Sequence, residues 1–394
     1  MPTKPTSKVP KRGFALAEYE DRHRRASELM QAGGFDALLV TSEQHVRYFT
    51  GFDSQFWNSP TRPWFVIVPR DKPLIAVIPE IGAEGMATTW VDDIRCWPAP
   101  VPEDDGVTLL SSALKEVTGT FGRIGAELGP EMVLRMPQVD FERVRDLTQP
   151  NGIEDGTAVL RALRGIKSSA EIEKARYICG VASDAFEALP QKLSAGDTER
   201  AACQNLKIDM LSRGADHAPY VMGVSGFGGY NNIIMGPTDR VIGRGDVLII
   251  DTGATFDGYF CDFDRNFTFG QPDDDAKRAY DVVYQATSAG IEAARPGATT
   301  TDLWRAMNEI LDSGGSLSNN VGRMGHGLGI QLTEWPSNKP GDDTILEPGM
   351  IMTVEPGMEF APGKMMVHEE NLVITEEGCE LLSRRAWPEM PVIE

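Results

Sequence analysis

Five side chains of the kinds that bind divalent metal ions are spread over the second half of the chain. Asp251 ends the apolar run VLII, and Asp262 follows eleven residues later, after a turn. His326 stands between glycines in GHGLG, and Glu355 ends the run MIMTV just before Pro-Gly. Glu369 lies in VHEENLVIT, where another strand-like run begins. Taken singly, each residue also has a structural explanation as a turn, cap or loop residue.

The four carboxylates share one feature, because each stands at the edge of an apolar run. A buried carboxylate is costly unless it is paired or bound to a metal. Four carboxylates and one imidazole suit two divalent cations that share bridging ligands. A set so rich in oxygen favours Mn²⁺, with Fe²⁺, Co²⁺ or Zn²⁺ as alternatives. Two such ions would hold a hydroxide as a nucleophile at neutral pH and polarise a carbonyl group.

The elements expected around these residues would bring them together. If the runs DVLIID (246–251) and GYFCDFDRNFTF (258–269) form a hairpin, Asp251 and Asp262 can point to one face. Helical patterns surround these runs at 157–190, 198–213, 275–294 and 301–313, and the end of the chain is strands and turns. This texture predicts an α+β domain with a substantial antiparallel sheet.

The first part of the chain has a different pattern of expected helices and strands. An amphipathic helix is expected at 16–32, and apolar strands are expected at 36–41, 64–69, 73–79 and 123–127. Such alternation is typical of an α/β domain. The segment QPNGIEDGT (149–157) is rich in turn-forming residues and is a candidate linker. We therefore expect two domains, residues 1–156 and residues 157–394.

The order and spacing of the motifs resemble those of a known family. DTGATFDGYFCDFDR resembles the D-x-G-(x)n-G-Y-x-x-D-x-x-R segment of the pita-bread metallopeptidases, which include aminopeptidase P, prolidase, methionine aminopeptidase and creatinase. GHGLGIQLTEWP resembles the family's GHGIG-x-x-x-HE-x-P segment. EPGMIMTVEPGM and HEENLVITEEG resemble its x-PGM-x-x-T-x-EPG and R-I-E-D-x-x-x-V-T-x-x-G segments. LRGIKSSAEIEKAR resembles the opening of the catalytic domain in prolidase-like members, so the match covers about 165–384.

The resemblance implies a creatinase-type N-terminal α/β domain followed by an α+β pita-bread catalytic domain, and it implies a homodimer. It makes Asp251, Asp262, His326, Glu355 and Glu369 the ligands of two metal ions, with Asp262 and Glu369 as the bridging ligands. Glu355 or Glu369 would then shuttle the proton during hydrolysis.

Four departures from the family's motifs affect its additional histidines and one arginine. Thr333 stands where proline-specific peptidases carry a His seven residues after the metal-binding one, and Gly322 stands where another precedes it by four. The segment NNIIM before PTDR (237–240) lacks a third His, and Val367 replaces an Arg. His217, in GADHAPYV, is the best remaining candidate for a proton-transfer group; the alternative is a hydrogen-bonded turn histidine.

Further substrate-binding candidates lie in loops. The glycine-rich segment GVSGFGGYNN does not match a dinucleotide-binding loop, and Tyr230 and Asn232 would be its polar side chains. Tyr259 lies beside the expected hairpin and would donate a hydrogen bond, and Thr333 belongs here because of its place in the motif. Arg265 is expected to pair with a ligand carboxylate and orient it.

An aromatic segment of the first domain, YFTGFDSQFWNSPTRPWF (48–65), also stands out. In creatinase-like dimers this region of one subunit reaches the active site of the other. The resemblance makes Trp57, Arg62 and Trp64 candidates for binding a substrate ring or carboxylate. The alternative is a loop that packs its aromatic rings onto the core of its own domain.

Composition narrows the choice of partners. With 38 Lys and Arg against 58 Asp and Glu, the net charge is −20, which repels phosphate backbones and argues against a nucleic acid. Five widely spaced cysteines without a CxxC pair indicate a reduced, cytoplasmic chain. No run of apolar residues is long enough to span a membrane, and no apolar stretch follows the basic N-terminus as in a signal peptide.

Three functions remain in view. The leading hypothesis is a dinuclear-metal hydrolase that cleaves an amide bond in a dipeptide, an Xaa-Pro peptide or a small peptide-like metabolite through a metal-bound hydroxide. The first alternative keeps the fold but acts as a creatinase-like amidinohydrolase or as a lyase on a small zwitterion. The second is a non-catalytic pita-bread module that binds a protein, although such modules typically lose metal ligands and this chain keeps all five.

Overall fold

The computed structural model describes residues 8–318 and 322–394. The chain divides into two compact units between Arg164 and Gly165. The N-terminal unit begins at Lys11, and the C-terminal unit ends at Glu394.

A mixed six-stranded sheet forms the centre of the N-terminal unit, in the order β4-β3-β2-β1-β5-β6. β1 pairs antiparallel with β2, and β2 with β3, whereas the other neighbours are parallel. Every residue of β1, β2 and β3 is buried, as their apolar sequences predict. The strands are β1 Ala37–Val40, β2 Phe65–Pro69, β3 Ile75–Pro79, β4 Asp93–Trp97, β5 Arg123–Ala126 and β6 Gly152–Asp155.

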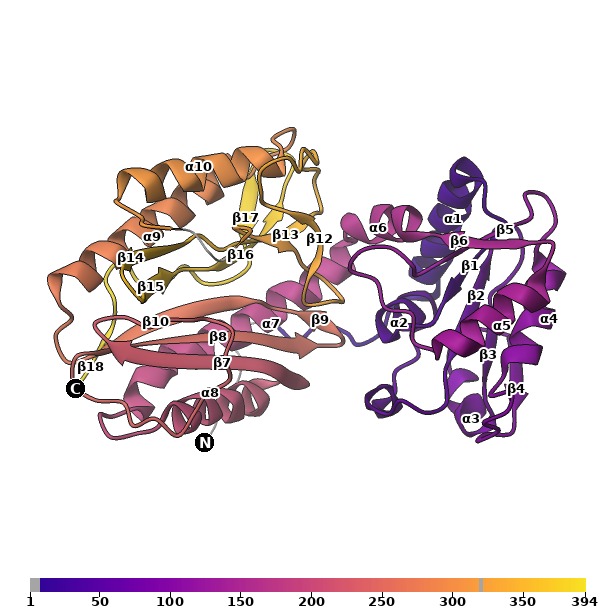
Figure 1. The fold of residues 1–394 in the computed structure, drawn as a ribbon, viewed down its shortest axis with the longest axis horizontal. Helices are drawn as coiled ribbons and strands as arrows, with labels where there is room; N and C mark the ends of the chain where they lie inside the picture. Colours follow the sequence, from indigo (N-terminus) through magenta and orange to yellow (C-terminus); the bar gives the residue numbers. More distant parts are fainter. Residues whose placement is uncertain (1–7, 319–321) are drawn as a thin grey trace. The chain divides into compact units, whose positions relative to one another are not determined.

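Helices cover both faces of this sheet (Figure 1). The apolar side chains of α4 and α5, such as Leu110 and Val144, share one core with Leu39 and Ile67 of the sheet. α1 lies on the other side and buries Met30. The unit is therefore an α/β domain, as predicted. Its helices are α1 Leu16–Gly33, α2 Glu43–Thr50, η1 Gln55–Asn58, η2 Glu80–Gly82, α3 Ala83–Met86, α4 Val107–Val117, α5 Gln138–Thr148 and α6 Thr157–Gly165.

The prediction of a linker at 149–157 is wrong for its central part, because Gly152–Asp155 is strand β6 and pairs with β5. Turn-forming residues flank this strand, and within it Ile153 alone is buried, so no apolar run marked it in the sequence. The two compact units separate just before Gly165, the last residue of α6, whereas the predicted domain boundary lies at the start of this helix.

Two sheets and a hairpin build the C-terminal unit. The first sheet has the order β18-β10-β8-β7, with β9 paired to β8, and the second has the order β12-β11-β13-β16-β17. β14 and β15 pair with each other. The strands are β7 His217–Phe227, β8 Asp246–Phe256, β9 Tyr259–Phe260, β10 Phe263–Phe269, β11 His326–Gly327, β12 Glu334–Ser337, β13 Ile351–Val354, β14 Gly357–Ala361, β15 Lys364–Val367, β16 Glu370–Ile374, β17 Cys379–Leu381 and β18 Val392–Ile393.

The sheets lie between two layers of helices (Figure 1). α7 and α8 pack below β7 and β8, through a core that includes Phe186 and Phe263. α9 and α10 pack above the hairpin and the second sheet, through a core that includes Leu303 and Met352. This α+β arrangement agrees with the prediction. The helices are α7 Ser169–Ala188, η3 Leu189–Lys192, α8 Glu199–Arg213, α9 Asp274–Ala293 and α10 Thr300–Ser313.

The segment GVSGFGGYNN is a loop only in its second half, because β7 continues to Phe227. Gly223 and Gly226 lie within the strand, whereas Gly228 and Gly229 follow it with positive φ angles of 66° and 154°. At Gly223, a Cβ atom would lie 2.2 Å from Cys203 Sγ of α8, so a larger residue would push the helix away. Within the described residues, no helix is long and apolar enough to cross a membrane.

Candidate metal centre

All five predicted metal-binding residues line one cavity in the C-terminal unit. The cavity has a volume of about 310 Å³, which is within the range of small-molecule sites. Its lining residues are Tyr220, Ile233, Ile234, Ile249, Asp251, Asp262, Asp264, Arg323, His326, Leu332, Thr333, Glu355, Val367 and Glu369.

Different strands deliver the five side chains. Asp251 lies in β8, and Asp262 lies just before β10, which is the antiparallel partner of β8. His326 opens β11, Glu355 follows β13, and Glu369 precedes β16. The expected hairpin therefore exists and is one half of the site, and the second sheet supplies the other half.

Three hydrogen bonds fix the backbone of this site. Asn371 of β16 accepts a hydrogen bond from the backbone N–H of Asp262 at 2.9 Å, and its Nδ2 donates one to the Asp262 carbonyl. Thr353 Oγ1 accepts a hydrogen bond from the backbone N–H of His326 at 2.9 Å. The first contact ties the two sheets together where their acidic residues meet.

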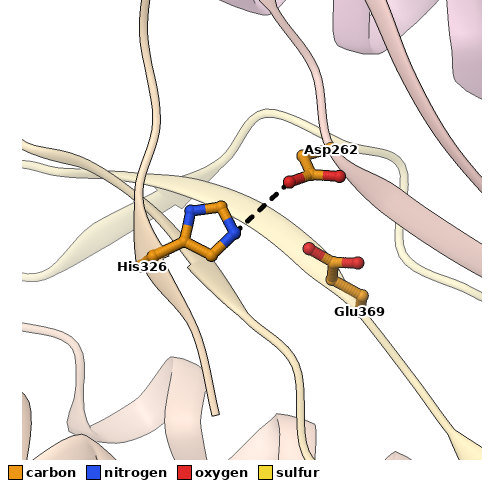
Figure 2. Close-up of side chains that lie close together, drawn as sticks. All are labelled: Asp262, His326 and Glu369. Carbon is orange, nitrogen blue, oxygen red and sulfur yellow. Dashed lines mark ion pairs between the residues drawn. The ribbon is translucent and has the colours of Figure 1, made fainter. Parts of the chain in front are cut away.

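The imidazole of His326 is oriented for metal binding. Its Nδ1 donates a hydrogen bond to the Gly327 carbonyl at 2.9 Å. The lone pair of Nε2 is then available to bind a metal ion. Nε2 lies 3.3 Å from Asp262 Oδ2 and 3.9 Å from Glu355 Oε1. Figure 2 shows the side chains of Asp262, His326 and Glu369 converging; donor atoms of these three lie within 4.8 Å of one another.

The protein alone does not balance the charge of this cluster. Burial and the neighbouring Asp262 raise the pKa of Asp251 to about 7, and burial raises the pKa of Asp262 to about 8. The pKa of Glu369 is held well above its usual range by burial and by the charges of Asp262 and Glu355. Burial also raises the pKa of Glu355, against the opposing effect of His326. Carboxyl groups that are buried together in this way need protons or cations.

Unsatisfied oxygen atoms give an independent test of metal binding. Among the described residues, Asp251 Oδ1 and Glu369 Oε1 are buried without a hydrogen-bond partner. A buried carboxylate oxygen without a partner costs free energy, and a divalent cation would satisfy both atoms. The residues present therefore fit a metal centre.

Three polar residues that line the cavity are not among the candidates predicted from the sequence. Tyr220 of β7 donates a hydrogen bond to Asp251 Oδ2 at 2.8 Å, and Arg323 lies near Glu355. Asp264 is buried, its Oδ1 has no hydrogen-bond partner, and burial and Asp251 raise its pKa well above the usual range. Alternation along β10 places Asp264 on the same face as Asp262, and this signal was readable from the sequence.

Some predicted substrate-binding residues do not line the cavity. The hydroxyl of Tyr230 is buried, where it donates to Asn266 Oδ1 at 2.9 Å and accepts from the Val367 N–H at 2.7 Å. The hydroxyl of Tyr259 is also buried and donates to Glu171 at 2.7 Å. Both hydroxyl groups hold the framework together and neither tyrosine lines the metal cavity, although Tyr230 lines a second cavity with Asn232. The interpretation of the two tyrosines as substrate-binding groups of the metal cavity is wrong.

Of the remaining polar candidates, only Thr333 lines the metal cavity. Asn232 lies in the turn after β7 and accepts a hydrogen bond from the Met235 N–H at 3.2 Å. His217 is exposed at the first residue of β7, and neither residue is among those that line the metal cavity. Thr333 does line it, beside Arg323. His217 is therefore not part of the cavity that the five residues line, and its role in proton transfer stays a prediction.

Arg265 and His368 bind other groups of the protein framework. Arg265 pairs with Glu370 at 3.0 Å and donates a hydrogen bond to the Glu369 carbonyl at 3.0 Å. The prediction that Arg265 pairs with a ligand carboxylate is wrong, because its partner is Glu370. The hydrogen bond to the carbonyl still fixes the backbone of Glu369. His368 is buried, and burial lowers its pKa well below the usual range. Its Nδ1 lies 3.1 Å from Thr287 Oγ1, on the side of α9.

The aromatic segment of the N-terminal unit packs onto its own core at one end. Trp64 is 1% exposed, and its ring packs against Phe52 with centroids 5.0 Å apart. A direct substrate contact by Trp64 is therefore excluded by burial. Trp57 packs against Trp64, with centroids 6.0 Å apart, and both Trp57 and Arg62 are only partly exposed. A substrate role for Trp57 and Arg62 stays a prediction.

Comparison with known proteins identifies the family. The model of metallopeptidase family M24 matches residues 173–377, and the model of the creatinase/prolidase N-terminal domain matches residues 22–166. The chain belongs to metallopeptidase family M24, with the N-terminal domain found in creatinase and prolidase. This membership confirms the predicted fold and the predicted class of metal-dependent hydrolase, and it establishes that the cavity belongs to a divalent-metal enzyme.

Relatives match over nearly the whole chain. A probable dipeptidase PepE from Mycobacterium tuberculosis is 35% identical over 375 residues, which are 93% of this chain and 95% of that protein. An Xaa-Pro dipeptidase from Pyrococcus furiosus is 28% identical over 366 residues, which are 93% of this chain and 98% of that protein.

Solved structures agree with this result. The dipeptidase PepE from Mycobacterium ulcerans superposes with a TM-score of 0.84 at 25% identity, covering 96% of this chain and 99% of that one. A prolidase from Thermococcus sibiricus superposes with a TM-score of 0.86 at 23% identity, covering 96% of this chain and all of the other. At this lower identity the second likeness establishes the fold alone.

Proposed function

We propose that this protein is a dipeptidase that hydrolyses the amide bond of dipeptides, including Xaa-Pro dipeptides. One observation carries the proposal: five side chains of metal-binding types line a cavity of small-molecule size, and buried carboxylate oxygens there lack partners. Family membership and the names of the relatives, an Xaa-Pro dipeptidase and a probable dipeptidase, support the substrate class.

We assign the metal ligands as Asp251, Asp262, His326, Glu355 and Glu369, for two divalent ions. Asp262 and Glu369 are the bridging ligands, which agrees with their closeness to each other and to His326. Mn²⁺ suits the excess of carboxylate oxygens, and Fe²⁺, Co²⁺ and Zn²⁺ are the alternatives. Divalent ions at such a site supply an activated water molecule and polarise the scissile carbonyl group.

The protein's own residues then handle protons and the substrate side chain. Glu355 is 21% exposed, more than Asp262, so its carboxylate is accessible from the cavity. We assign to it the proton taken from the attacking water and delivered to the leaving nitrogen. Ile233, Ile249 and Leu332 form an apolar wall, which suits a proline ring or an aliphatic side chain.

One observation favours the alternative, a creatinase-like amidinohydrolase or a lyase on a small zwitterion. Among the described residues that line the cavity, His326 is the only histidine. A proline-specific peptidase would carry further histidines there, at the places taken by Gly322 and Thr333. Assays of creatine and of a sulfonium zwitterion beside Ala-Pro and Ala-Leu separate the two functions.

Two further proposals rest on resemblance and composition. A homodimer is proposed from the creatinase-like architecture. Size-exclusion chromatography with light scattering tests this proposal. A cytoplasmic location is proposed because all five cysteines are free.

The test of the function is a dipeptide panel on protein loaded with Mn²⁺, together with the variant Asp262→Ala. We expect hydrolysis of at least one dipeptide and a loss of more than 1,000-fold in the variant, because a bridging ligand is removed. Full activity and full metal content in the variant would refute the proposal.

A further inference from the structure

Arg323 gives the metal cavity a single positively charged corner. Among the described residues that line the cavity, it is the only arginine or lysine, whereas five are carboxylic acids. It is carried by the segment that leads into β11, three residues before His326. Its side chain is 30% exposed, so solutes in the cavity can reach the guanidinium group.

The guanidinium contacts neutral hydroxyl groups of the neighbouring chain segment. Nη2 donates a hydrogen bond to Thr333 Oγ1 at 3.4 Å, and Nη1 donates one to Ser337 Oγ at 3.3 Å. Both contacts are long for an arginine, whose strong hydrogen bonds are short and go to carboxylates or phosphates. The metal-binding residue Glu355 lies nearby, with its Oε1 4.0 Å from Nε.

These contacts connect two departures from the peptidase motifs. Thr333 occupies the place of one expected histidine, and Arg323 directly follows Gly322, which occupies the place of another. Arg323 therefore contacts the residue at one departure and adjoins the other in the sequence. The replacement changes the chemistry there from a titratable imidazole to a permanent cation with a planar, forked set of donors.

Apart from bound metal ions, Arg323 is the cationic group among the described lining residues that can pair with an anion. A dipeptide carries one anionic group in every case, its terminal carboxylate. That carboxylate is separated from the preceding peptide carbonyl by about one residue, ~3.8 Å along the chain. Arg323 Nε lies 4.0 Å from Glu355 Oε1, so a carboxylate held at Arg323 lies next to the candidate metal-binding residues.

We propose that Arg323 binds the terminal carboxylate of the substrate and thereby makes the enzyme selective for dipeptides over longer or amidated peptides. The inference rests on the proposed dipeptidase function and adds to it a specificity-determining residue. The carboxylate takes two parallel hydrogen bonds from the guanidinium and displaces its weaker contacts with Thr333 and Ser337.

The experiment compares a free carboxylate with its amide. Wild-type protein and the variants Arg323→Gln and Arg323→Lys, all loaded with Mn²⁺, are assayed on Ala-Pro and on Ala-prolinamide. Arg305→Gln is the matched control, because Arg305 lies on α10, is exposed and pairs with Asp302. Metal content and the binding of N-acetylproline and N-acetylprolinamide by calorimetry are measured on each protein.

In wild type we expect a preference of at least tenfold for Ala-Pro. Arg323→Gln raises KM for Ala-Pro at least tenfold and changes kcat less than threefold, and it leaves Ala-prolinamide and the metal content unaffected. Arg323→Lys restores part of the preference, because a charge remains without the fork. The control behaves as wild type.

Three results would overturn the inference: equal losses on both substrates, loss of metal in Arg323→Gln, or no preference for the free carboxylate in wild type. Loss of metal would mean that Arg323 only positions Glu355. If wild type hydrolyses neither substrate, the dipeptidase proposal fails. In that case weaker binding of N-acetylproline to Arg323→Gln still supports the carboxylate site, and unchanged or absent binding refutes it.

Discussion

The hydroxyl of Tyr220 donates a hydrogen bond to Oδ2 of Asp251 at 2.8 Å, between the neighbouring strands β7 and β8. The other oxygen of the same carboxylate, Oδ1, is buried without a hydrogen-bond partner. One oxygen is thus held by the protein and the other is left for a cation. The sequence motifs contain Asp251 but not Tyr220, so the orientation of the ligand depends on a residue outside them.

Removing this hydroxyl should weaken the metal site without removing a ligand. In Tyr220→Phe we expect metal affinity to fall about tenfold to 100-fold, since partners that orient a ligand contribute that much. A competition titration with a chromophoric chelator measures the change. Tyr280→Phe is the control, because its hydroxyl donates to the Trp387 carbonyl at 2.7 Å, outside the cavity lining. Equal affinities in Tyr220→Phe and wild type would contradict the assignment.

Glu369 is assigned as a bridging ligand, so Glu369→Gln should affect both ions. We expect hydrolysis to fall at least 1,000-fold and metal content to drop below one ion per chain, because an amide is a weak, neutral ligand. Kinetics and mass spectrometry of the same preparation measure both quantities. Glu376→Gln, at an exposed position in the same part of the chain, should behave as wild type. A Glu369→Gln variant that keeps two ions would exclude the bridging role.

Metal binding should release protons below pH 8. Burial raises the pKa of Asp251 to about 7 and that of Asp262 to about 8, so in the metal-free protein both groups hold protons at pH 6. Metal binding requires the ionised form, and apparent affinity therefore rises by up to about tenfold per pH unit for each proton displaced. Calorimetry in buffers of different ionisation enthalpy counts these protons. Affinity that is constant from pH 6 to pH 8 would contradict the prediction.

The same shifts determine how pH affects the metal-free protein. Because the folded pKa values of Asp251 and Asp262 lie above the values in an unfolded chain, the folded state binds more protons than the unfolded state between about pH 4 and pH 8. Stability of the metal-free protein should therefore fall as pH rises through this window. Denaturant titrations with and without Mn²⁺ test this, since bound metal should remove the loss.

Asp36 should behave in the opposite way. Burial alone would raise its pKa, but the backbone N–H groups of Gly119, Thr120, Phe121 and Gly122 donate to its carboxylate and lower the pKa overall. A lowered folded pKa stabilises the protein above pH 4, and that stability is lost as pH falls through the folded pKa. Asp36→Asn should cost about 1–3 kcal/mol at pH 7 and less near pH 3. A cost that is the same at both pH values would contradict this account.

The sequence predicted the parts of the molecule that short-range patterns specify. Helix α1 and strands β1 to β3 follow from periodicity and apolar runs. Motif spacing singled out five candidate metal-binding residues, and all five line one cavity. Strand β6 was not predictable in this way, because a four-residue strand with one buried residue, Ile153, carries little signal. The prediction that these five residues form one site came from the family resemblance, because no single stretch of sequence contains all of them.

Side-chain direction accounts for most of the wrong predictions. Tyr230 and Tyr259 have the right chemistry and lie close to the right strands, but their hydroxyl groups bind within the framework. Trp64 lies in an aromatic segment that the sequence alone left open to two interpretations, and burial decides between them. Arg323 was missed because its contacts with Thr333 and Ser337 depend on how β12 pairs beside β11.

The central claim is that the five side chains around the cavity hold two divalent metal ions. The most direct test is the metal content, by mass spectrometry, of protein purified without chelator and then incubated with Mn²⁺ or Co²⁺ and desalted. The account predicts about two ions per chain in wild type and fewer in Asp262→Ala. Essentially no bound metal in wild type would contradict it, and the carboxyl groups would then have to act as protonated acids.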